Sequence, residues 1–499
     1  MVKATLRMVW RRAPLLALAF TIFAAPAPTR KNGIESAAAA ADFRLMNAIF
    51  SQAHATAFRQ IPKGDVPDIF KDAGRVSIRD FIARVLAYYR GIKVDHTQIG
   101  FSSELIEELG LGNTMFPFPL KFFDGNAHFD CEYHDIPFGS ELTHINGRPM
   151  VEILRDINKV FGIQSVPGKW DDYRLEENFS FLYYIARGEE KEWSLSVRPP
   201  RAAAARVVNY RIREGGNAPR IQRASLSLSQ YQQPLVTMYV PRAKSLYFAV
   251  NTFMPSMNQL DSFESWHNYL SLLHNEANAR KPENLIIDLR QNKGGVMNFS
   301  AFAAQWFLEN PLTDKSRNRI RTRMLPFREH IVGLNAENAE EMMLKRVEQH
   351  MQDFYSDKMQ DGYFEVRNND ATKLELKPVR GAYKFRRIVV LMGPATYSAA
   401  VNFARLLKIG NPNVTLVGQE TGSPGSGHAA DILVTYRLPV TALLILVPLA
   451  QVDFFPLVNG QQQQRGLMPD IVVKDKADDF AQGRDTLIEH ATQLLNSGK

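Results

Sequence analysis

Residues 387–410 read RIVVLMGPATYSAAVNFARLLKIG. The apolar and mostly β-branched run at 388–392, bounded by a glycine and a proline, predicts a buried strand. Apolar residues at helical spacing follow Ser398, and Lys408 and Gly410 are typical of a helix's last turn and stop. We therefore predict a strand and a helix with a serine at their junction.

Ser398 has two interpretations at that junction. The first N–H groups of a helix have no intrahelical partner and favour nearby negative charge, which is the environment that an acyl-transfer nucleophile needs. Serine is also among the best N-cap residues, and the local pattern alone favours this structural role.

A second stretch, residues 284–295, reads NLIIDLRQNKGG. Its apolar run at 285–289 predicts another buried strand, and Gly294 and Gly295 follow a polar segment. Paired glycines after a strand allow an unusual turn and a close approach of the backbone to a ligand. By itself, such a pair is most often only a turn.

The combination is more specific. LIIDLRQNKGG is followed in order by VLMGPATYSAAVNFA, LVGQETGS and RGLMPDIVV. In residue type, order and spacing, this series resembles the C-terminal processing (tail-specific) serine peptidase family over residues 245–473, with one interruption. The resemblance implies an α/β fold with a crotonase/ClpP-like serine protease core, an N-terminal helical segment and a PDZ-like β-rich domain.

The resemblance also implies a catalytic site. Ser398 is the expected nucleophile, and the expected oxyanion hole consists of the N–H of Ala399 and that of Gly294 or Gly295. A serine hydroxyl needs a positioned base as well as these donors.

The base decides which branch of the family the chain resembles. The position of the lysine in the tail-specific branch falls on Pro424, so a Ser–Lys pair is not expected. The stretch Asp95-His96-Thr97 resembles the Asp-His-Thr segment of the histidine-using branch, which includes the tricorn core protease and the chlamydial secreted protease. His96 is therefore the expected general base, with His428 as the alternative.

In those relatives a glutamate orients the histidine, and the matching position here is Gln463. A glutamine can hold a histidine by a hydrogen bond, but it cannot stabilise an imidazolium by charge. Asp95 or Glu420 could substitute for the missing carboxylate.

The first 41 residues have the order of a secretory signal peptide. Basic residues precede a short apolar run at 13–25, and small residues follow, with cleavage expected after Ala41. The run is too short to span a membrane. We expect an exported protein, periplasmic or secreted, without an integral membrane span once the signal is removed.

Charge and cysteine content argue against a nucleic-acid-binding protein, a disulfide-stabilised fold and a cysteine-based zinc site. Residues 1–41 hold six Lys or Arg and one Glu, so they carry +5 of the formal +8 and leave about +3, which gives no case for nucleic acid. Cys131 is the single cysteine, so there is no internal disulfide framework and no cysteine-based zinc site. We expect neither a metal nor a cofactor.

Seven segments are expected: the signal peptide at 1–41, a helical segment with the candidate base at 42–99, a PDZ-like domain at 100–201, the first half of the protease core at 202–310, a charged helical insertion at 311–380, the second half of the core at 381–475, and a C-terminal helix at 476–499. The PDZ-like domain has two interpretations, peptide capture by strand addition or packing alone. The insertion is either a lid, self-processed by analogy with the chlamydial relatives, or a solvated flap.

The sequence thus predicts an exported serine endopeptidase that hydrolyses polypeptides through an acyl-enzyme on Ser398. The alternative is a catalytically inactive binding protein for peptides or lipids on the same fold, which Gln463 favours. A third hypothesis is a structural envelope protein that works through its PDZ-like domain. Homodimer formation is kept open.

Overall fold

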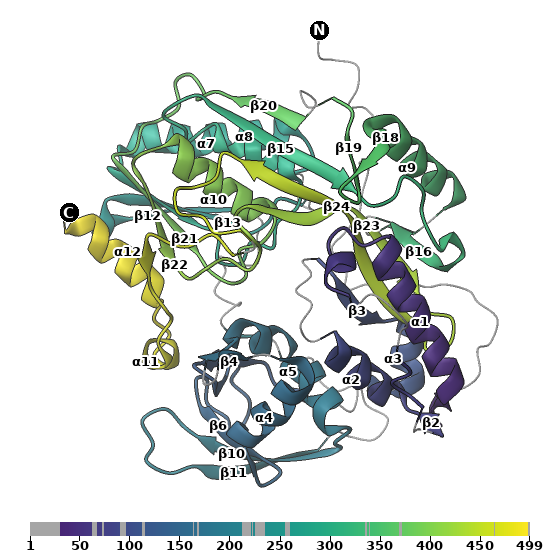
Figure 1. Cartoon of the computed structure of the whole chain (residues 1–499). Coiled ribbons are helices and arrows are strands. Elements are labelled where there is room, and N and C mark those ends of the chain that lie inside the picture. Colours follow the sequence, from purple (N-terminus) through teal and green to yellow (C-terminus); the bar gives the residue numbers. More distant parts are fainter. Residues whose placement is uncertain are drawn as a thin grey trace.

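The computed structural model describes most of the chain between residues 30 and 497. The described residues are 30–61, 67–71, 74–89, 96–111, 115–162, 164–166, 169–211, 221, 223–224, 235–254, 260–334, 337–338, 340–368, 372–463 and 465–497. Figure 1 shows a sheet-and-helix core at the upper left, a second sheet running to the right, and a β-rich domain below.

A six-stranded sheet forms the centre of the core. Its order is β12-β13-β14-β21-β22-β25, and only β12 is antiparallel to its neighbour. Each residue of β13 and of β14 is buried, as expected for parallel strands covered on both faces. The strands are β12 (Leu235–Val240), β13 (Ser245–Val250), β14 (Asn284–Asp288), β21 (Arg387–Met392), β22 (Val414–Gly418) and β25 (Ile471–Val472).

Helices cover both faces of this sheet. Alternate strand residues such as Phe248 and Ile287 pack with α7, α8 and α10, whereas Tyr247 and Ile286 pack with α12. The expected strands and the helix after Ser398 are therefore confirmed, but the closing helix is interrupted and forms two helices. The helices are α7 (Phe263–Arg280), α8 (Met297–Ala304), α10 (Ala399–Gly410), α11 (Ala477–Ala481) and α12 (Thr486–Asn496).

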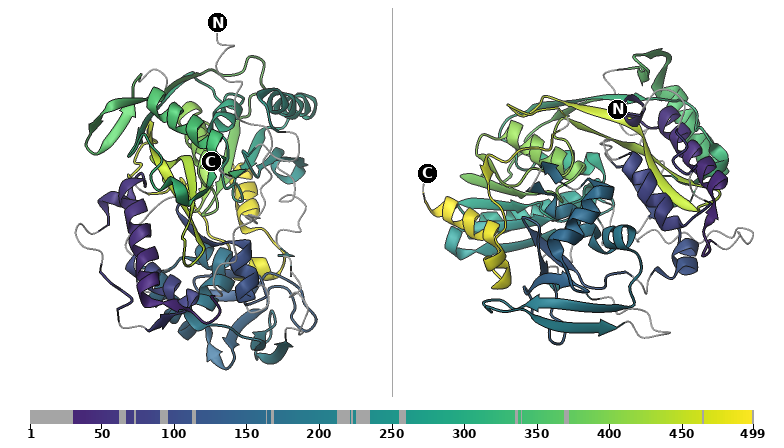
Figure 2. Two further views of the ribbon diagram at one scale, coloured as in Figure 1. Left: turned by 90° about the vertical axis from the view of Figure 1, so that its right-hand side faces the viewer. Right: turned by 60° about the horizontal axis from the view of Figure 1, so that its bottom comes forward.

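A second, nine-stranded sheet has the order β17-β16-β23-β24-β15-β19-β18, and β20 and β3 add to β15 and β24. Its long strands β23 and β24 run from the core to the N-terminal helices (Figures 1 and 2). The strands are β3 (Gln98–Phe101), β15 (Leu312–Ile320), β16 (Ile331–Leu334), β17 (Glu337–Asn338), β18 (Tyr355–Gln360), β19 (Tyr363–Val366), β20 (Lys373–Leu376), β23 (Gly427–Arg437) and β24 (Leu443–Phe455).

The expectation of a helical insertion at 311–380 is wrong for most of its length. Among the described residues of this segment, α9 (Glu341–Phe354) is the one α-helix, and the segment otherwise supplies β15 to β20. The arginines on β15 pair across strands: Arg317 with Glu365, and Arg319 with Asp453. The segment is therefore part of the second sheet.

The β-rich domain is PDZ-like, as expected, and its last strand, β11, lies beyond residue 201. Asn146 and Gly147 form the predicted turn with φ angles of 49° and 74°, the combination that a type I′ hairpin turn requires. The elements are β4 (Leu120–Phe123), β5 (Asn126–Phe129), β6 (Glu141–Ile145), β7 (Arg148–Pro149), α4 (Met150–Phe161), β8 (Gln164–Val166), β9 (Lys169–Trp170), α5 (Asp172–Arg187), β10 (Glu192–Arg198) and β11 (Arg206–Arg211).

The N-terminal segment contains α1 (Ser36–Gln52), α2 (Ile78–Tyr88) and α3 (Ser103–Leu109), with β1 (Ile34–Glu35) paired to β2 (Arg75–Val76). Ala39 and Ala40 are buried in α1, so the leader boundary expected at Ala41 falls inside this helix. The basic and apolar parts of the leader lie outside the described residues. No helix in the described part of the chain has the length and apolar character to cross a membrane.

Candidate active site

The two motif loops meet because their strands are neighbours. β14 and β21 pair in parallel, with Asp288 opposite Leu391, so the loops that follow them leave the same edge of the sheet. A Cβ atom on Gly294 would lie 2.7 Å from the Cβ of Ser398, and the φ of Gly294 is +96°. Only glycine fits this contact without strain.

Ser398 has an unusual backbone conformation for a residue with a side chain, with φ 51° and ψ −119°. It occupies the N-cap position of α10, yet its side chain makes no capping hydrogen bond. The interpretation of its hydroxyl as a helix cap is therefore wrong. A strained serine at a strand-to-helix turn is the geometry of a nucleophile elbow, in which the turn presents the hydroxyl for reaction.

Asn292 organises the glycine loop and was missed from the sequence. Its Nδ2 donates to Val250 O at 2.9 Å, and its Oδ1 accepts the Gly294 N–H at 2.8 Å. Its own carbonyl accepts the Tyr397 N–H at 2.9 Å, which ties this loop to the serine turn. The buried Asn292 thus connects both loops, and the only signal in the sequence was its place two residues before the glycine pair.

Gly294 and Gly295 make different backbone contacts. The Gly294 N–H is already engaged by Asn292, whereas Gly295 is bridged to Phe253 in parallel. In that bridge the Phe253 N–H donates to the Gly294 carbonyl, and the Phe253 carbonyl accepts the Val296 N–H. The N–H of Gly295 itself therefore points away from Phe253.

A third loop, between β22 and β23, supports the serine turn. The Ser398 N–H donates to the buried Ser423 Oγ at 2.7 Å, and the Gly422 N–H donates to Thr396 O at 3.1 Å. Pro424, at the lysine position of the resemblance, forms a β-bridge with Gly466. Ser423 is a second supporting residue that the sequence did not single out.

Both candidate bases lie beside the serine turn. The His96 ring is 5.0 Å from the ring of Tyr397, the residue before the serine, and 5.7 Å from the ring of His428. His96 is half-buried and has a φ of 56°, whereas His428 is buried on β23 against Phe454.

The segment that carries His96 is held by His54, which follows α1. His54 Nδ1 accepts the N–H groups of Thr56 and Ala57, so its Nε2 bears the proton and donates to Thr97 Oγ1 at 2.6 Å. This contact fixes the residue next to His96.

The carboxylate candidates are placed differently. Gln463 is exposed in a turn, and Asp95 lies outside the described residues. Glu420 pairs with Arg465 at 2.6 Å and accepts the Gly466 N–H at 2.9 Å. An orienting role for any of the three stays a prediction.

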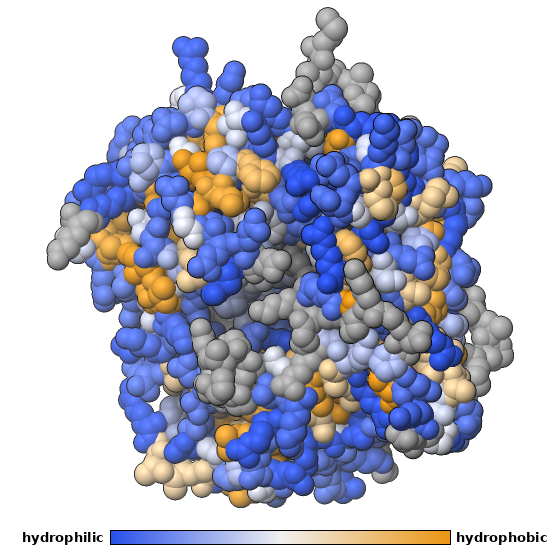
Figure 3. All heavy atoms as spheres, viewed as in Figure 1, coloured by the Kyte–Doolittle hydropathy of each residue, from blue (hydrophilic) through white to orange (hydrophobic). Residues whose placement is uncertain are grey.

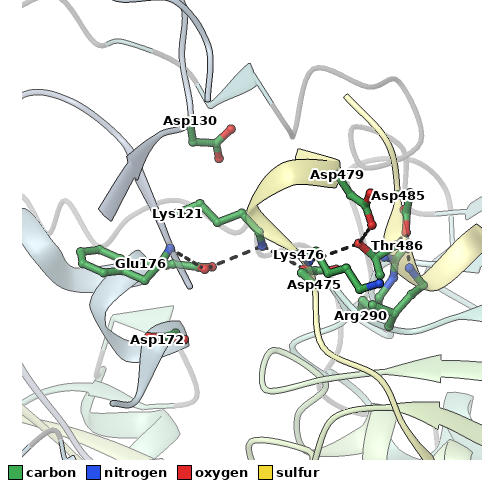
Figure 4. A network of polar contacts seen from close by, with 12 residues as sticks. Lys121, Asp130, Asp172, Glu176, Arg290, Asp475, Lys476, Asp479, Asp485 and Thr486 are labelled. Atoms are coloured by element: carbon green, nitrogen blue, oxygen red, sulfur yellow. Dashed lines mark hydrogen bonds and ion pairs between the residues drawn. The ribbon is translucent and has the colours of Figure 1, made fainter. Parts of the chain in front are cut away.

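Ion pairs dock the PDZ-like domain beside the glycine loop. Lys121 on β4 pairs with Asp475 at 3.1 Å (Figure 4). Lys293, next to Gly294, pairs with Glu177 on α5. Burial lowers the pKa of Lys121, but the charges of Glu176 and Asp475 outweigh burial and hold that pKa above its usual value. The molecular surface is hollowed between the core and this domain (Figure 3).

A metal site is not apparent, because no group of three or more His, Cys, Asp or Glu side chains among the described residues could hold an ion.

Comparisons with known proteins identify a similar family and similar folds. Residues 253–473 match the model of peptidase family S41. A structure of mature CPAF complexed with lactacystin is 13% identical in sequence and superposes with a TM-score of 0.59, over 93% of this chain and 99% of that one. A second structure of mature CPAF is 14% identical and has the same TM-score, over 93% of this chain and 98% of that one. This likeness shows a shared fold. A search of curated proteins gives no match.

Proposed function

Residues 253–473 of this chain belong to peptidase family S41, and from this premise we propose an exported serine endopeptidase that cleaves polypeptides through an acyl-enzyme on Ser398. His96 is the general base in this proposal, and the N–H groups of Gly295 and Ala399 form the oxyanion hole. The single observation that carries the proposal is the strained Ser398, uncapped and in contact with Gly294.

The expected reaction follows acyl-transfer chemistry. His96 takes the proton of the Ser398 hydroxyl while the oxygen attacks the peptide carbonyl, and it then gives that proton to the leaving amine. Water hydrolyses the ester in a second step that uses the same base. Amide donors for the oxyanion are worth about 2.7–4 kcal/mol each, which explains the constraint on the glycine loop.

Hydrolysis of an unfolded polypeptide by the purified protein tests the proposal. We expect new amino termini to form, and we expect Ser398→Ala to lower the rate by about 10⁴-fold or more. Equal product formation by Ser398→Ala would overturn the proposal. If the unaltered protein binds the polypeptide without cleaving it, the alternative hypothesis of a catalytically inactive binding protein is correct instead.

Export is proposed from the leader pattern. Because the boundary at Ala41 would cut α1, we propose that removal of the leader leaves α1 whole. Sequencing the amino terminus of the protein recovered from cells tests this: a start after the apolar run at 13–25 and no later than Ser36 agrees with the proposal, whereas a start at Met1 or inside α1 contradicts it.

A further inference from the structure

One acidic residue outside the predicted site interacts electrostatically with the candidate base. Asp431 lies in β23, where the pairing with β24 shifts between Ala430 and Leu433. Two residues, 431 and 432, therefore stand opposite one residue of β24, which is a β-bulge. Bulges re-aim a side chain and are over-represented next to active sites.

The backbone of Asp431 is as unusual as that of the two proposed reacting residues. Its φ is 67°, compared with 51° for Ser398 and 56° for His96. Left-handed conformations of residues other than glycine are costly and cluster at active sites, because the surrounding structure must hold them there. Three such residues from three different segments converge in this region.

The strand register places Asp431 on the same face as the site. His428 on β23 and Asn318 on β15 both stand opposite Val452 of β24, so their side chains share one face of the sheet. Asn318 Nδ2 donates to Asp431 Oδ2 at 3.5 Å, and the His428 ring contacts the His96 ring. Asp431 and His96 therefore lie on one face around His428.

Charge supports this arrangement. The Asp431 side chain is reached by solvent on one side but is otherwise surrounded by protein, and removal from bulk water raises the pKa of its carboxyl. The charge of His96 acts in the opposite direction on the same carboxyl, which is the interaction expected between an imidazolium and a nearby carboxylate.

We propose that Asp431, rather than Gln463, is the positioning residue that orients His96 and stabilises its imidazolium. The inference rests on the proposed function. The proton that Ser398 loses stays on His96 until the leaving amine takes it, and the proposed role requires an ionised Asp431 beside that imidazolium. Asp431 therefore supplies the negative charge that Gln463 cannot.

The test compares Asp431→Asn with two matched controls. Asparagine has the same shape and tolerates a left-handed conformation, so the bulge should survive. Asp361→Asn makes the same change at another exposed aspartate of this sheet, with a φ of 50°, and Gln463→Ala removes the side chain at the position that the resemblance favours. Thermal unfolding shows whether each variant folds.

We expect Asp431→Asn to lower kcat by roughly 10²- to 10⁴-fold with little change in KM, and both controls to stay within about threefold of the unaltered protein. The acid limb of kcat/KM should move to lower pH in Asp431→Asn alone, because a neutral amide no longer favours a charged imidazole. Asp431→Glu should recover part of the loss.

Two results would overturn the inference, and they are distinguishable from each other. If Asp431→Asn has the kcat and the pH profile of Asp361→Asn while the unaltered protein is active, Asp431 has no role in positioning and the proposed function stands. If the unaltered protein shows no hydrolysis that depends on Ser398, the proposed function fails and this inference fails with it.

Discussion

The two halves of the candidate site are built in different ways. The nucleophile half consists of two loops that follow adjacent parallel strands, β14 and β21, and each loop lies within a dozen residues of its strand. The base half collects His96, His428 and Asp431 on the nine-stranded sheet, in which β3 pairs with β24, more than 340 residues later in the chain. Local sequence therefore determines the first half, whereas long-range pairing determines the second.

Breaking the contact between the two halves of the site should cause the largest loss of stability. Arg405 on α10 is fully buried, contacts Asp314 of β15 at 2.5 Å and lies 4.8 Å from the Phe454 ring of β24. Asp314→Ala leaves this guanidinium buried without its carboxylate, and we expect a loss of about 3–5 kcal/mol in the free energy of unfolding.

Lys408 on the same helix is the control for that experiment, because it pairs with Asp470 near the surface. Lys408→Ala should cost under about 1 kcal/mol in urea unfolding. Equal losses in Asp314→Ala and Lys408→Ala would show that the two halves do not depend on the buried pair.

Disrupting the nucleophile half alone should remove activity. Gly294→Ala places a methyl group against Ser398, and we expect kcat/KM to fall by at least about 10²-fold. Gly393→Ala, in the next loop, meets no atom within 4 Å and serves as the control. Peptide hydrolysis and thermal unfolding measure both variants, and full activity in Gly294→Ala would contradict the proposed contact.

The buried His274, on α7 in the nucleophile half, should make the stability of the protein depend on pH. Burial, with a smaller contribution from the charge of Lys384, lowers the pKa of His274 to about 4, so the folded protein holds this ring neutral. The unfolded chain binds the proton more readily, so stability is complete above about pH 6.5 and falls by about 3 kcal/mol as the pH drops towards 4.

In His274→Asn the Oδ1 atom can still accept the Tyr383 N–H, so this contribution to the pH dependence should disappear without a lost hydrogen bond. Urea unfolding at pH 7 and pH 5 measures the difference. An unchanged slope of stability against pH would show that His274 is not held neutral.

The smallest expected effect concerns the strain at Ser398. Glycine adopts a φ of 51° without strain, so Ser398→Gly should be more stable than Ser398→Ala by about 1 kcal/mol, although both lack the nucleophile. Thermal unfolding of the two variants measures this difference. Equal stability would mean that the turn is not strained.

The sequence predicted the nucleophile half well, because buried apolar runs such as 285–289 and 388–392 indicate parallel strands and each ends at a motif. It did not predict that residues 311–380 contribute strands to the second sheet. The charged stretch around Arg317 and Arg319 has no apolar stripe, since its side chains pair with acids on neighbouring strands. Asp431 was missed for the same reason: a bulge is a property of the pairing between two strands, and no local pattern marks it.

Labelling by a fluorophosphonate probe tests the central claim most directly, because the probe reacts only with a serine that a base has activated. We predict that the unaltered protein is labelled, that Ser398→Ala and His96→Ala are not, and that His428→Ala still is. Labelling of His96→Ala at the rate of the unaltered protein, or no labelling of the unaltered protein, would contradict the account.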